Sequence, residues 1–345
     1  MLSGLPRRWR VMACAVSAAG LAAIIATAPA MAQQQVGQRV SIAVIGDLGY
    51  FPEQQQQQVD NVLADIGRDT ALSFVAHLGD LSRPIHACRP EFIRKWRESF
   101  DALPHAVIFT PGDNDWTDCH DDEGVKGGNP SERLADLRAV MFPTETSLGK
   151  RAMPVLRQSR DSAHASYREN ARWDVGGVTF LTLHVVGSNN NRGRTPDSDA
   201  EYEARNAANL AWLRQGFAHA VTAGSRGVMV LQQANLWPEI TPNAGAAKDP
   251  SGFAELRAAL EKEVAAFGRP VVIMHGDSHF FRIDNAFHKR PPRGQPGTPA
   301  PANFTRVEIF GTPNHHWLHV TIDPDDPNVF TFRPRIVAAN VPRKN

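Results

Sequence analysis

Short apolar runs that each end in a glycine and an aspartate are the dominant pattern along this chain. Four such runs lead to Gly-Asp pairs at 46–47, 79–80, 112–113 and 276–277, and these are all the Gly-Asp pairs in the sequence. A continuous apolar run bounded by turn residues is typical of a strand that is buried on both faces. The pattern therefore predicts four buried strands, each with a carboxylate just beyond its carboxyl end.

Between the runs, apolar residues recur at the three- and four-residue spacing of amphipathic helices. Helices predicted to begin at Pro52 and Pro90 separate the first three strands, and this β-α-β-α-β order predicts parallel strands with right-handed crossovers. The other elements predicted before the fourth Gly-Asp run are helices over 129–141, 202–220 and 253–267 and strands over 177–186 and 228–231.

The pattern changes after the fourth Gly-Asp pair. The Pro- and Gly-rich stretch 289–302 is predicted to be a loop, and strand-like runs follow over 306–310, 317–322 and 329–332. Because no helix separates these runs, they predict antiparallel strands and hence a second, mixed sheet. The polar region 117–170 contains one predicted helix. We predict that this region is an insertion that forms a wall of a site at the strand ends.

The amino terminus has the composition of an export signal. Three arginines precede an apolar core and the small-x-small sequence Ala30-Met31-Ala32. We predict a signal peptide over 1–32, cleaved before Gln33, and therefore a periplasmic or secreted protein. An uncleaved anchor is the alternative, although the apolar core is short for a membrane span. The sequence does not separate the general export route from the twin-arginine route.

Charge and cysteine content limit the classes of binding partner and the cellular compartment that the sequence predicts. The 37 basic and 36 acidic side chains nearly balance, so net charge gives no indication of a nucleic-acid partner. Cys88 and Cys119 are the cysteines left after the signal peptide. In an oxidising compartment we predict that they form a disulfide joining two loops at the strand ends. Two unrelated buried cysteines are the alternative.

The four aspartates indicate a metal site if their strands lie side by side. One Gly-Asp pair after a strand is ordinary turn chemistry. Four carboxylates at one edge of a sheet would lie where open α/β sheets bind ligands. Like charges held together there require a cation between them or shifted pKa values. The repeated pattern therefore predicts bound metal.

Five blocks resemble, in order and in placement at strand ends, those of the calcineurin-like metallophosphoesterases, including the purple acid phosphatases. They are Gly46-Asp47, Gly79-Asp80, Gly112-Asp113-Asn114-Asp115, Val230-Leu-Gln-Gln233 and Gly276-Asp277-Ser278-His279. The resemblance spans essentially the whole chain after the signal peptide. It implies an α/β fold, a four-layer α/β/β/α sandwich of two mixed sheets, with a catalytic domain over 33–345. It also implies that a metal-bound hydroxide hydrolyses a phosphate mono- or diester.

The resemblance assigns ligands for two divalent metal ions. Carried over by position, Asp47, Asp80 and His279 would hold one ion, and Asp80, Asp113, Gln233 and Asp277 the second. Asp113, Gln233 and Asp277 stand where the family usually has Asn, His and His. Oxygen ligands in place of imidazoles favour Mg²⁺, Mn²⁺ or Ca²⁺ over Zn²⁺, and the choice among these and Fe is open.

Asn114 occupies the position of the family's histidine that assists the leaving group or the phosphate. Asparagine can donate a hydrogen bond but cannot transfer a proton. His184 and His275 are candidates to replace that histidine, as is His77, since each lies near the end of a predicted strand. For each of the three, a hydrogen-bonded core histidine is the alternative.

Two further positions depart from the purple acid phosphatases. Their tyrosine after the second block is Arg83 here. Tyr50 could replace that tyrosine, and a packed aromatic side chain is the alternative. Arg83 and Arg89 could bind phosphate, although exposed arginines are common. The polar segment 188–191 could contact a ligand or form only a turn.

Together these features predict an exported, metal-dependent hydrolase of a small phosphorylated substrate, with no membrane association after cleavage of the signal. The alternative is a degenerate, non-catalytic binding protein of the same fold in the periplasm. The sequence does not identify the substrate, the preference for monoesters or diesters, or the oligomeric state.

Overall fold

A computed structural model describes the chain at Met1 and over 38–238, 250–288, 293, 296–297 and 299–342. Apart from Met1, the predicted signal peptide over 1–32 lies outside these residues, as does part of the predicted loop 289–302. Gln34–Asn345 form one compact unit, whose fold is described below. Within the described residues, no helix combines the length and the apolar character needed to cross a bilayer.

The first sheet contains the three strands predicted to run parallel. Its strand order is β12-β11-β1-β2-β3, with β1 parallel to β2 and β2 parallel to β3, which confirms the prediction. Two late strands complete it, since β11 pairs antiparallel with β1 and β12 antiparallel with β11. The strand bounds are β1 Val40–Ile45, β2 Leu72–His77, β3 Ala106–Phe109, β11 Trp317–Ile322 and β12 Phe330–Arg335.

The second sheet is assembled around four parallel strands. Its order is β4-β5-β6-β7-β8-β10-β9, in which β6, β7, β8 and β10 are parallel and the outer strands are antiparallel. The bounds are β4 Leu156–Arg157, β5 Ala171–Val175, β6 Val178–Thr182, β7 Gly227–Leu231, β8 Val271–His275, β9 Arg282–Asp284 and β10 Phe304–Glu308. Three of these strands, β4, β5 and β9, were not predicted.

The last three strands do not form a sheet of their own, which corrects one prediction. Strand β10 joins β8 in parallel, whereas β11 and β12 return to the first sheet beside β1. The chain therefore crosses from the second sheet to the first between β10 and β11, without a helix between these strands. Both sheets are nevertheless mixed, as predicted.

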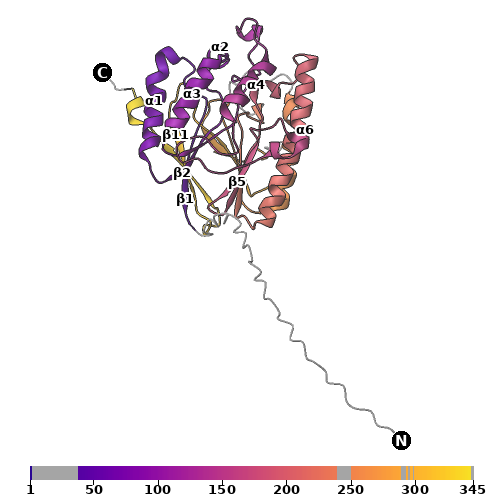
Figure 1. The fold of residues 1–345 in the computed structure, drawn as a ribbon. Helices are drawn as coiled ribbons and strands as arrows, with labels where there is room; N and C mark the ends of the chain where they lie inside the picture. The colour runs from indigo at the N-terminus through magenta and orange to yellow at the C-terminus, as the bar shows by residue number, and fades with distance from the viewer. Residues whose placement is uncertain (2–37, 239–249, 289–292, 294–295, 298, 343–345) are drawn as a thin grey trace. The chain divides into compact units, whose positions relative to one another are not determined.

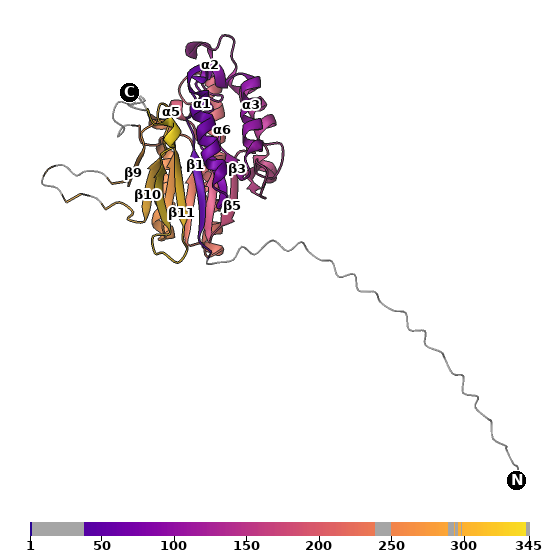
Figure 2. The same cartoon turned by 90° about the vertical axis from the view of Figure 1, so that its left-hand side faces the viewer.

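Three hydrophobic interfaces separate four layers, which confirms the predicted α/β/β/α sandwich (Figure 1, Figure 2). One cluster fills the space between the sheets, and the other two lie between each sheet and its outer helices. Along β1, Ile42 and Val44 face the other sheet, while Ala43 and Ile45 face the helices. This explains why the strand is an unbroken apolar run.

The helices cover the two outer faces. Helices α1 (Pro52–Arg68), α3 (Pro90–Ala102) and α4 (Pro130–Met141) pack on the first sheet, and α6 (Pro196–Thr222) and α7 (Ala254–Phe267) on the second. Each was predicted, but α6 begins earlier than expected because Thr195 and Ser198 form a capping box at its start. Helix α7 ends as predicted at Gly268, which has a φ of 66°.

Phe74 on β2 provides a test of the packing between the sheets. Its fully buried ring meets the rings of Trp173 and Phe180 of the second sheet edge to face, with centroids 5.5 and 5.2 Å away. We expect Phe74→Ala to lower the free energy of unfolding by about 3–5 kcal/mol, as measured by urea denaturation. Val221→Ala, at a position that is 58% exposed, should change it by less than about 0.5 kcal/mol. Equal effects of the two changes would contradict this account of the core.

Candidate active site

Three of the four aspartates of the Gly-Asp pairs leave their strands in a left-handed backbone conformation. Asp47, Asp80 and Asp277 have φ values of 53°, 53° and 74°, and His279 has a φ of 58°. Aspartate tolerates this left-handed conformation better than most residues, because its short side chain bonds the local backbone. The turns place the carboxylates beyond the strand ends, where the loops of both sheets meet.

Asp47 connects the end of β1 to the end of β8. Its Oδ1 accepts a hydrogen bond from the backbone N–H of Asp277 (3.0 Å) and lies 3.4 Å from Nε2 of His279. Its Oδ2 is buried and has no hydrogen-bond partner. A Cβ at Gly276 would lie 1.8 Å from that oxygen, so only glycine allows this approach. Nδ1 of His279 faces the carbonyl oxygen of Thr312 (2.8 Å), which directs Nε2 at Asp47.

Asp80 lies within a group of hydrogen-bond donors. Its Oδ2 accepts from the Tyr50 hydroxyl (2.5 Å) and from Nδ2 of Asn114 (3.1 Å). Its Oδ1 accepts from the backbone N–H of Asn114 (3.2 Å). A Cβ at Gly112 would lie 2.0 Å from Oδ1, so this glycine also makes room for a carboxylate. Tyr50 is therefore part of the site, because it contacts Asp80 directly.

Asp113 is held by the side chain of Gln233, which lies just beyond the end of β7. Nε2 of Gln233 donates to its Oδ1 (2.8 Å), while Oε1 of Gln233 accepts from the N–H of Gly187 (2.7 Å). Asp113 and Asp277 are neighbours across Gly187, since a Cβ there would lie 2.4 Å from Oδ2 of Asp113 and 2.7 Å from Oδ1 of Asp277. The four aspartates, Gln233, Asn114 and His279 thus lie together.

The carboxylates strongly perturb one another. Burial and the charges of Asp113 and Asp47 raise the pKa of Asp80 well above its ordinary value. Burial, with Asp277 next in importance, raises the pKa of Asp113 to about 7. Burial also raises the pKa of Asp277 to about 7, with Asp47 contributing. For His279, burial lowers the pKa, but the hydrogen bond and charge of Asp47 outweigh it and raise the value to about 9. The cluster therefore favours either protons or a cation.

The donor atoms suit a hard divalent cation. Buried carboxylate oxygens are the ligands that Mg²⁺, Mn²⁺ and Ca²⁺ prefer, and the unpartnered Oδ2 of Asp47 is one such atom. In the described part of the chain, no three His, Cys, Asp or Glu side chains converge on one point as they lie. Several carboxylate oxygens are taken up by Tyr50, Asn114, Gln233 and Ser188 instead. The site thus has the oxygen atoms that a divalent cation prefers. In this structure several of them accept hydrogen bonds from neighbouring side chains.

The histidines considered as proton donors lie in the core. Nδ1 of His184 is 2.7 Å from Oε1 of Glu169, and the ring packs near Trp116. Nδ1 of His275 faces the carbonyl of Gly276, and burial lowers its pKa to about 3. His77 is enclosed by the rings of Trp96, Phe100 and Phe109, and burial lowers its pKa to about 3 as well. No hydrogen bond or ion pair in the described residues joins these three histidines to the four aspartates.

Three further residues contribute: Asp115 and Asp118, to which sequence reasoning gave no role, and Ser188, from the segment expected to contact a ligand or form only a turn. Asp115 accepts backbone hydrogen bonds from Asp80, Leu81 and Gly112 at 2.8–3.0 Å, which joins the loops after β2 and β3. Its place in the Gly-Asp-Asn-Asp block was the signal available. Ser188 Oγ lies 3.0 Å from carboxylate oxygens of both Asp113 and Asp118. Neither Ser188 nor Asp118 stands in a pattern that would reveal this contact.

The segment that carries Ser188 has an unusual backbone. Residues 188–191, one serine and three asparagines, have φ values between 49° and 67°, which makes a left-handed turn around α5 (Gly187–Asn190). Left-handed conformation costs roughly 1–2 kcal/mol per non-glycine residue. The buried guanidinium of Arg205 stabilises the turn by donating to Oδ1 and the carbonyl of Asn190, at 2.5 and 3.0 Å.

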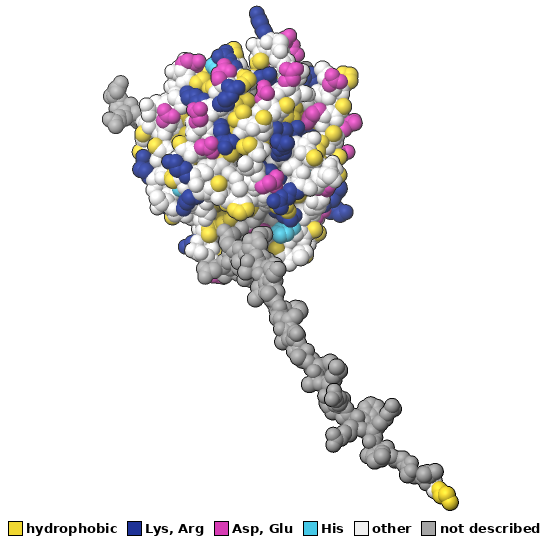
Figure 3. All heavy atoms as spheres, viewed as in Figure 1, with side chains coloured by type: hydrophobic (Ala, Val, Ile, Leu, Met, Phe, Trp, Pro, Cys, Tyr) yellow, Lys and Arg dark blue, Asp and Glu magenta, His cyan; other side chains and the backbone are white. Residues whose placement is uncertain are grey.

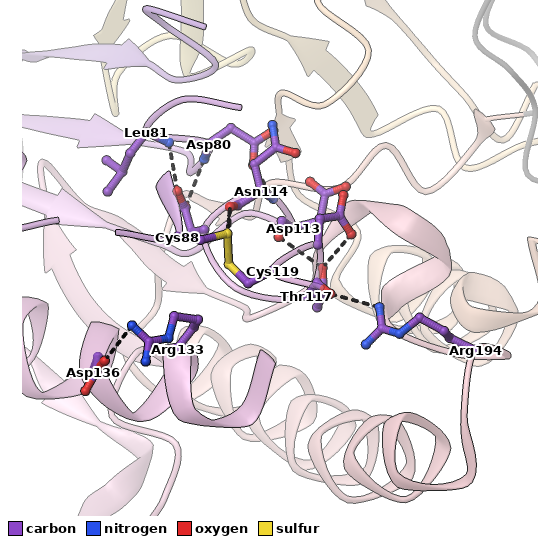
Figure 4. Close-up of a disulfide and its surroundings, with 12 residues drawn as sticks. Asp80, Leu81, Cys88, Asp113, Asn114, Thr117, Cys119, Arg133, Asp136 and Arg194 are labelled. Carbon is purple, nitrogen blue, oxygen red and sulfur yellow. Dashed lines mark hydrogen bonds and ion pairs between the residues drawn. A yellow bond between two sulfur atoms is a disulfide. The ribbon is translucent and has the colours of Figure 1, made fainter. Parts of the chain in front are cut away.

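A disulfide joins Cys88 to Cys119, as the sequence suggested (Figure 4). Cys88 follows the short helix α2 (Pro84–Ala87) after β2, and Cys119 lies in the loop after β3. Both sulfur atoms approach the backbone carbonyl of Asn114, at 3.7 and 3.9 Å. The bridge thus ties together the two loops that carry Asp80 and Asp113.

Comparison with known proteins identifies the fold. No protein-family model matches the sequence, and no curated protein matches it. A dimetal phosphatase from Danio rerio is similar in structure, with a TM-score of 0.54, 13% identity and coverage of 87% of this chain and 96% of that chain. A 5'-nucleotidase from Candida albicans aligns with a TM-score of 0.43 and 9% identity, over 88% of this chain and 52% of that chain. The first likeness shows that this chain has the calcineurin-like phosphoesterase fold, as predicted.

Removal of the disulfide should loosen the site loops. We expect Cys88→Ser/Cys119→Ser to lower the free energy of unfolding by about 2–4 kcal/mol, because the reduced chain gains freedom when unfolded. Urea denaturation of the double variant and of the oxidised protein measures this difference. A reducing agent should shift the oxidised protein toward the variant and leave the variant unchanged. Identical midpoints for both proteins would contradict the prediction.

The raised carboxylate pKa values predict how a cation stabilises the protein at different pH. Asp113 and Asp277 change from an ordinary pKa of 3.8 to about 7 in the folded protein. Without a cation, the folded state then binds more protons than the unfolded state between these values, so its stability falls as pH rises through this window. We expect Mn²⁺ to raise Tm more at about pH 8 than at about pH 5. Equal shifts at matched ionic strength would argue against cation binding by these carboxylates.

Proposed function

We propose that this chain is a metal-dependent phosphoester hydrolase. The observation that carries the proposal is the meeting of Asp47, Asp80, Asp113 and Asp277 with His279 at the carboxyl ends of strands from both sheets. The calcineurin-like fold supports it, because the similar Danio rerio structure is described as a dimetal phosphatase. Basic and acidic side chains are interspersed on the face shown in Figure 3, which fits a small substrate better than a nucleic acid.

The proposed metal ligands are those that the family resemblance assigns, and contacts at the strand ends support them. Asp47, Asp80 and His279 would hold one ion, and Asp80, Asp113, Gln233 and Asp277 the other. The contact of Asp47 with His279 and the proximity of Asp113 to Asp277 support this division. Gln233 would have to turn its amide, because its NH₂ group now faces Asp113. When bound, a pair of divalent cations activates water and offsets negative charge on the phosphoryl group.

The chain's own residues supply hydrogen bonds and burial. Nδ2 of Asn114 donates to both Tyr50 and Asp80, so it is aimed at the centre of the site. Burial raises the pKa of the Tyr50 hydroxyl well above its ordinary value, which keeps it a neutral donor. Neither group is suited to give a proton to a departing alkoxide at neutral pH. This favours substrates whose leaving group is stable without a proton, such as phenolic esters.

The proposal is tested by metal analysis followed by assay. We expect protein purified without chelators to contain divalent metal, and to hydrolyse nitrophenyl phosphate mono- or diesters with added Mn²⁺ or Mg²⁺. Asp80→Asn, which removes a charge at nearly constant size, should lower kcat/KM by about a hundredfold or more, because Asp80 is shared by both proposed ions. Asp325→Asn, at an exposed position, is the matched control and should have no effect.

The same assay separates the hydrolase from a non-catalytic protein of the same fold. Metal-dependent turnover that is lost in Asp80→Asn but kept in Asp325→Asn supports the hydrolase. If the protein contains stoichiometric metal but hydrolyses neither monoesters nor diesters, the hydrolase proposal is wrong and the chain is a metal-binding protein. Circular dichroism of Asp80→Asn shows whether a loss of activity reflects chemistry or misfolding.

A further inference from the structure

Two phenyl rings stand out on the surface beside the candidate site. All 17 phenylalanines lie in the described part of the chain, and among them only Phe51 and Phe280 are exposed, at 39% and 50%. Each directly follows a residue of the site, Tyr50 or His279, whose own rings meet edge to face with centroids 4.7 Å apart. The two exposed rings therefore follow two side chains that touch each other.

The backbone on each side of these rings is well anchored. The carbonyl of Phe51 accepts from Gln54 and Gln55 at the start of α1, at 2.9 and 2.8 Å. The N–H of Phe280 donates to Oε1 of Glu308 (3.0 Å), and the next ring, Phe281, stacks on Phe310 with centroids 4.4 Å apart. The chain thus holds both phenyl groups at the surface instead of folding them into the core. Single exposed apolar side chains are ordinary, but apolar side chains exposed together beside a site can mark a ligand-binding surface.

Each ring also has a guanidinium over one face. Cζ of Arg83 lies 4.5 Å from the centroid of Phe51, and Cζ of Arg282 lies 5.9 Å from that of Phe280. Such cation–π contacts orient a ring, and both rings remain partly exposed to solvent. Arg282 is paired with Glu308, whereas Arg83 makes no side-chain hydrogen bond or ion pair with the described residues. An uncompensated guanidinium three residues after Asp80 would attract a phosphoryl group.

We propose that Phe51, Phe280 and Arg83 form a substrate-recognition rim for phosphate esters that carry a planar aromatic group. The aromatic group stacks on the two exposed phenyl rings, while the phosphoryl group lies at the aspartate cluster within reach of the Arg83 charge. This inference rests on the proposed hydrolase function and adds the substrate class. Stacking on a fixed ring is favourable and tolerates different aromatic groups, since each has a π-face.

Two non-hydrolysable analogues test the rim without any turnover. Phenylphosphonate and methylphosphonate carry the same anionic group and differ in the ring, and calorimetry with the Mn²⁺-loaded protein measures the Kd of each. We expect phenylphosphonate to bind about tenfold more tightly, the difference that about 1.4 kcal/mol of stacking gives. Phe51→Ala and Phe280→Ala should each reduce this ratio severalfold and leave the Kd of methylphosphonate unchanged.

Three further variants sharpen the result. Phe280→Tyr keeps an aromatic ring and should retain the ratio. Arg83→Gln should raise the Kd of both analogues, because its charge serves the shared phosphonyl group, and that of phenylphosphonate at least as much, because Arg83 also orients the Phe51 ring. Val221→Ala removes an exposed apolar side chain near the far end of α6 and should change neither Kd.

The outcomes distinguish a failure of the aromatic rim from a failure of the proposed hydrolase function. Equal binding of the two analogues, or a ratio unaffected by Phe51→Ala and Phe280→Ala, would overturn the aromatic rim and leave the hydrolase standing. Failure of the metal-loaded protein to bind either phosphonate would contradict both proposals.

Discussion

Mutual repulsion among buried carboxylates is the constraint on which this structure depends. Four aspartates lie together beyond the strand ends, and burial together with neighbouring charges raises the pKa values of Asp80, Asp113 and Asp277. Hydrogen-bond donors from Tyr50, Asn114, Gln233 and the backbone surround them. Glycines at 112, 187 and 276 allow the close approach, since a Cβ at any of them would overlap a carboxylate oxygen. At Gly112 and Gly276 the Gly-Asp pattern thus reflects a steric requirement of the site as well as a turn.

Much of the sandwich could be predicted because its central strands are buried on both faces. Such strands are unbroken apolar runs, and the prolines at the starts of α1, α3 and α4 mark the helices between them. The outer strands were missed because they lack this signature: β5 alternates buried and exposed residues, and β9 is three residues long with two exposed. The return of β11 to β1 was also missed, because pairing between strands so distant in sequence leaves no local pattern.

Within the site, the carboxylates and the donors Tyr50, Asn114 and Gln233 could be found from the sequence, whereas the contacts of Asp115 and Ser188 could not. Asp115 accepts backbone N–H groups with its carboxylate and Ser188 contacts Asp113 with its hydroxyl, and neither contact leaves a pattern in the sequence. The histidines show the opposite problem, since closeness to a strand end says nothing about which face a side chain takes. Side chains alternate along a strand, so His77 faces helix α3 while its neighbour Ala76 faces the other sheet. A side chain one position earlier or later along the strand faces the opposite side of the sheet, so one position decides whether a residue lies in the site or in the core.

The left-handed turn over 188–191 joins three separate segments of the chain. Ser188 contacts the loop after β3, Asn190 is held by Arg205 of α6, and Asn189 and Asn190 bond Gly252 in the short helix η5 (Pro250–Phe253). Residues that share partners in this way have non-additive effects when substituted. Divergence at these positions should therefore be epistatic: a change at one becomes tolerable only in a background where its partners have already changed.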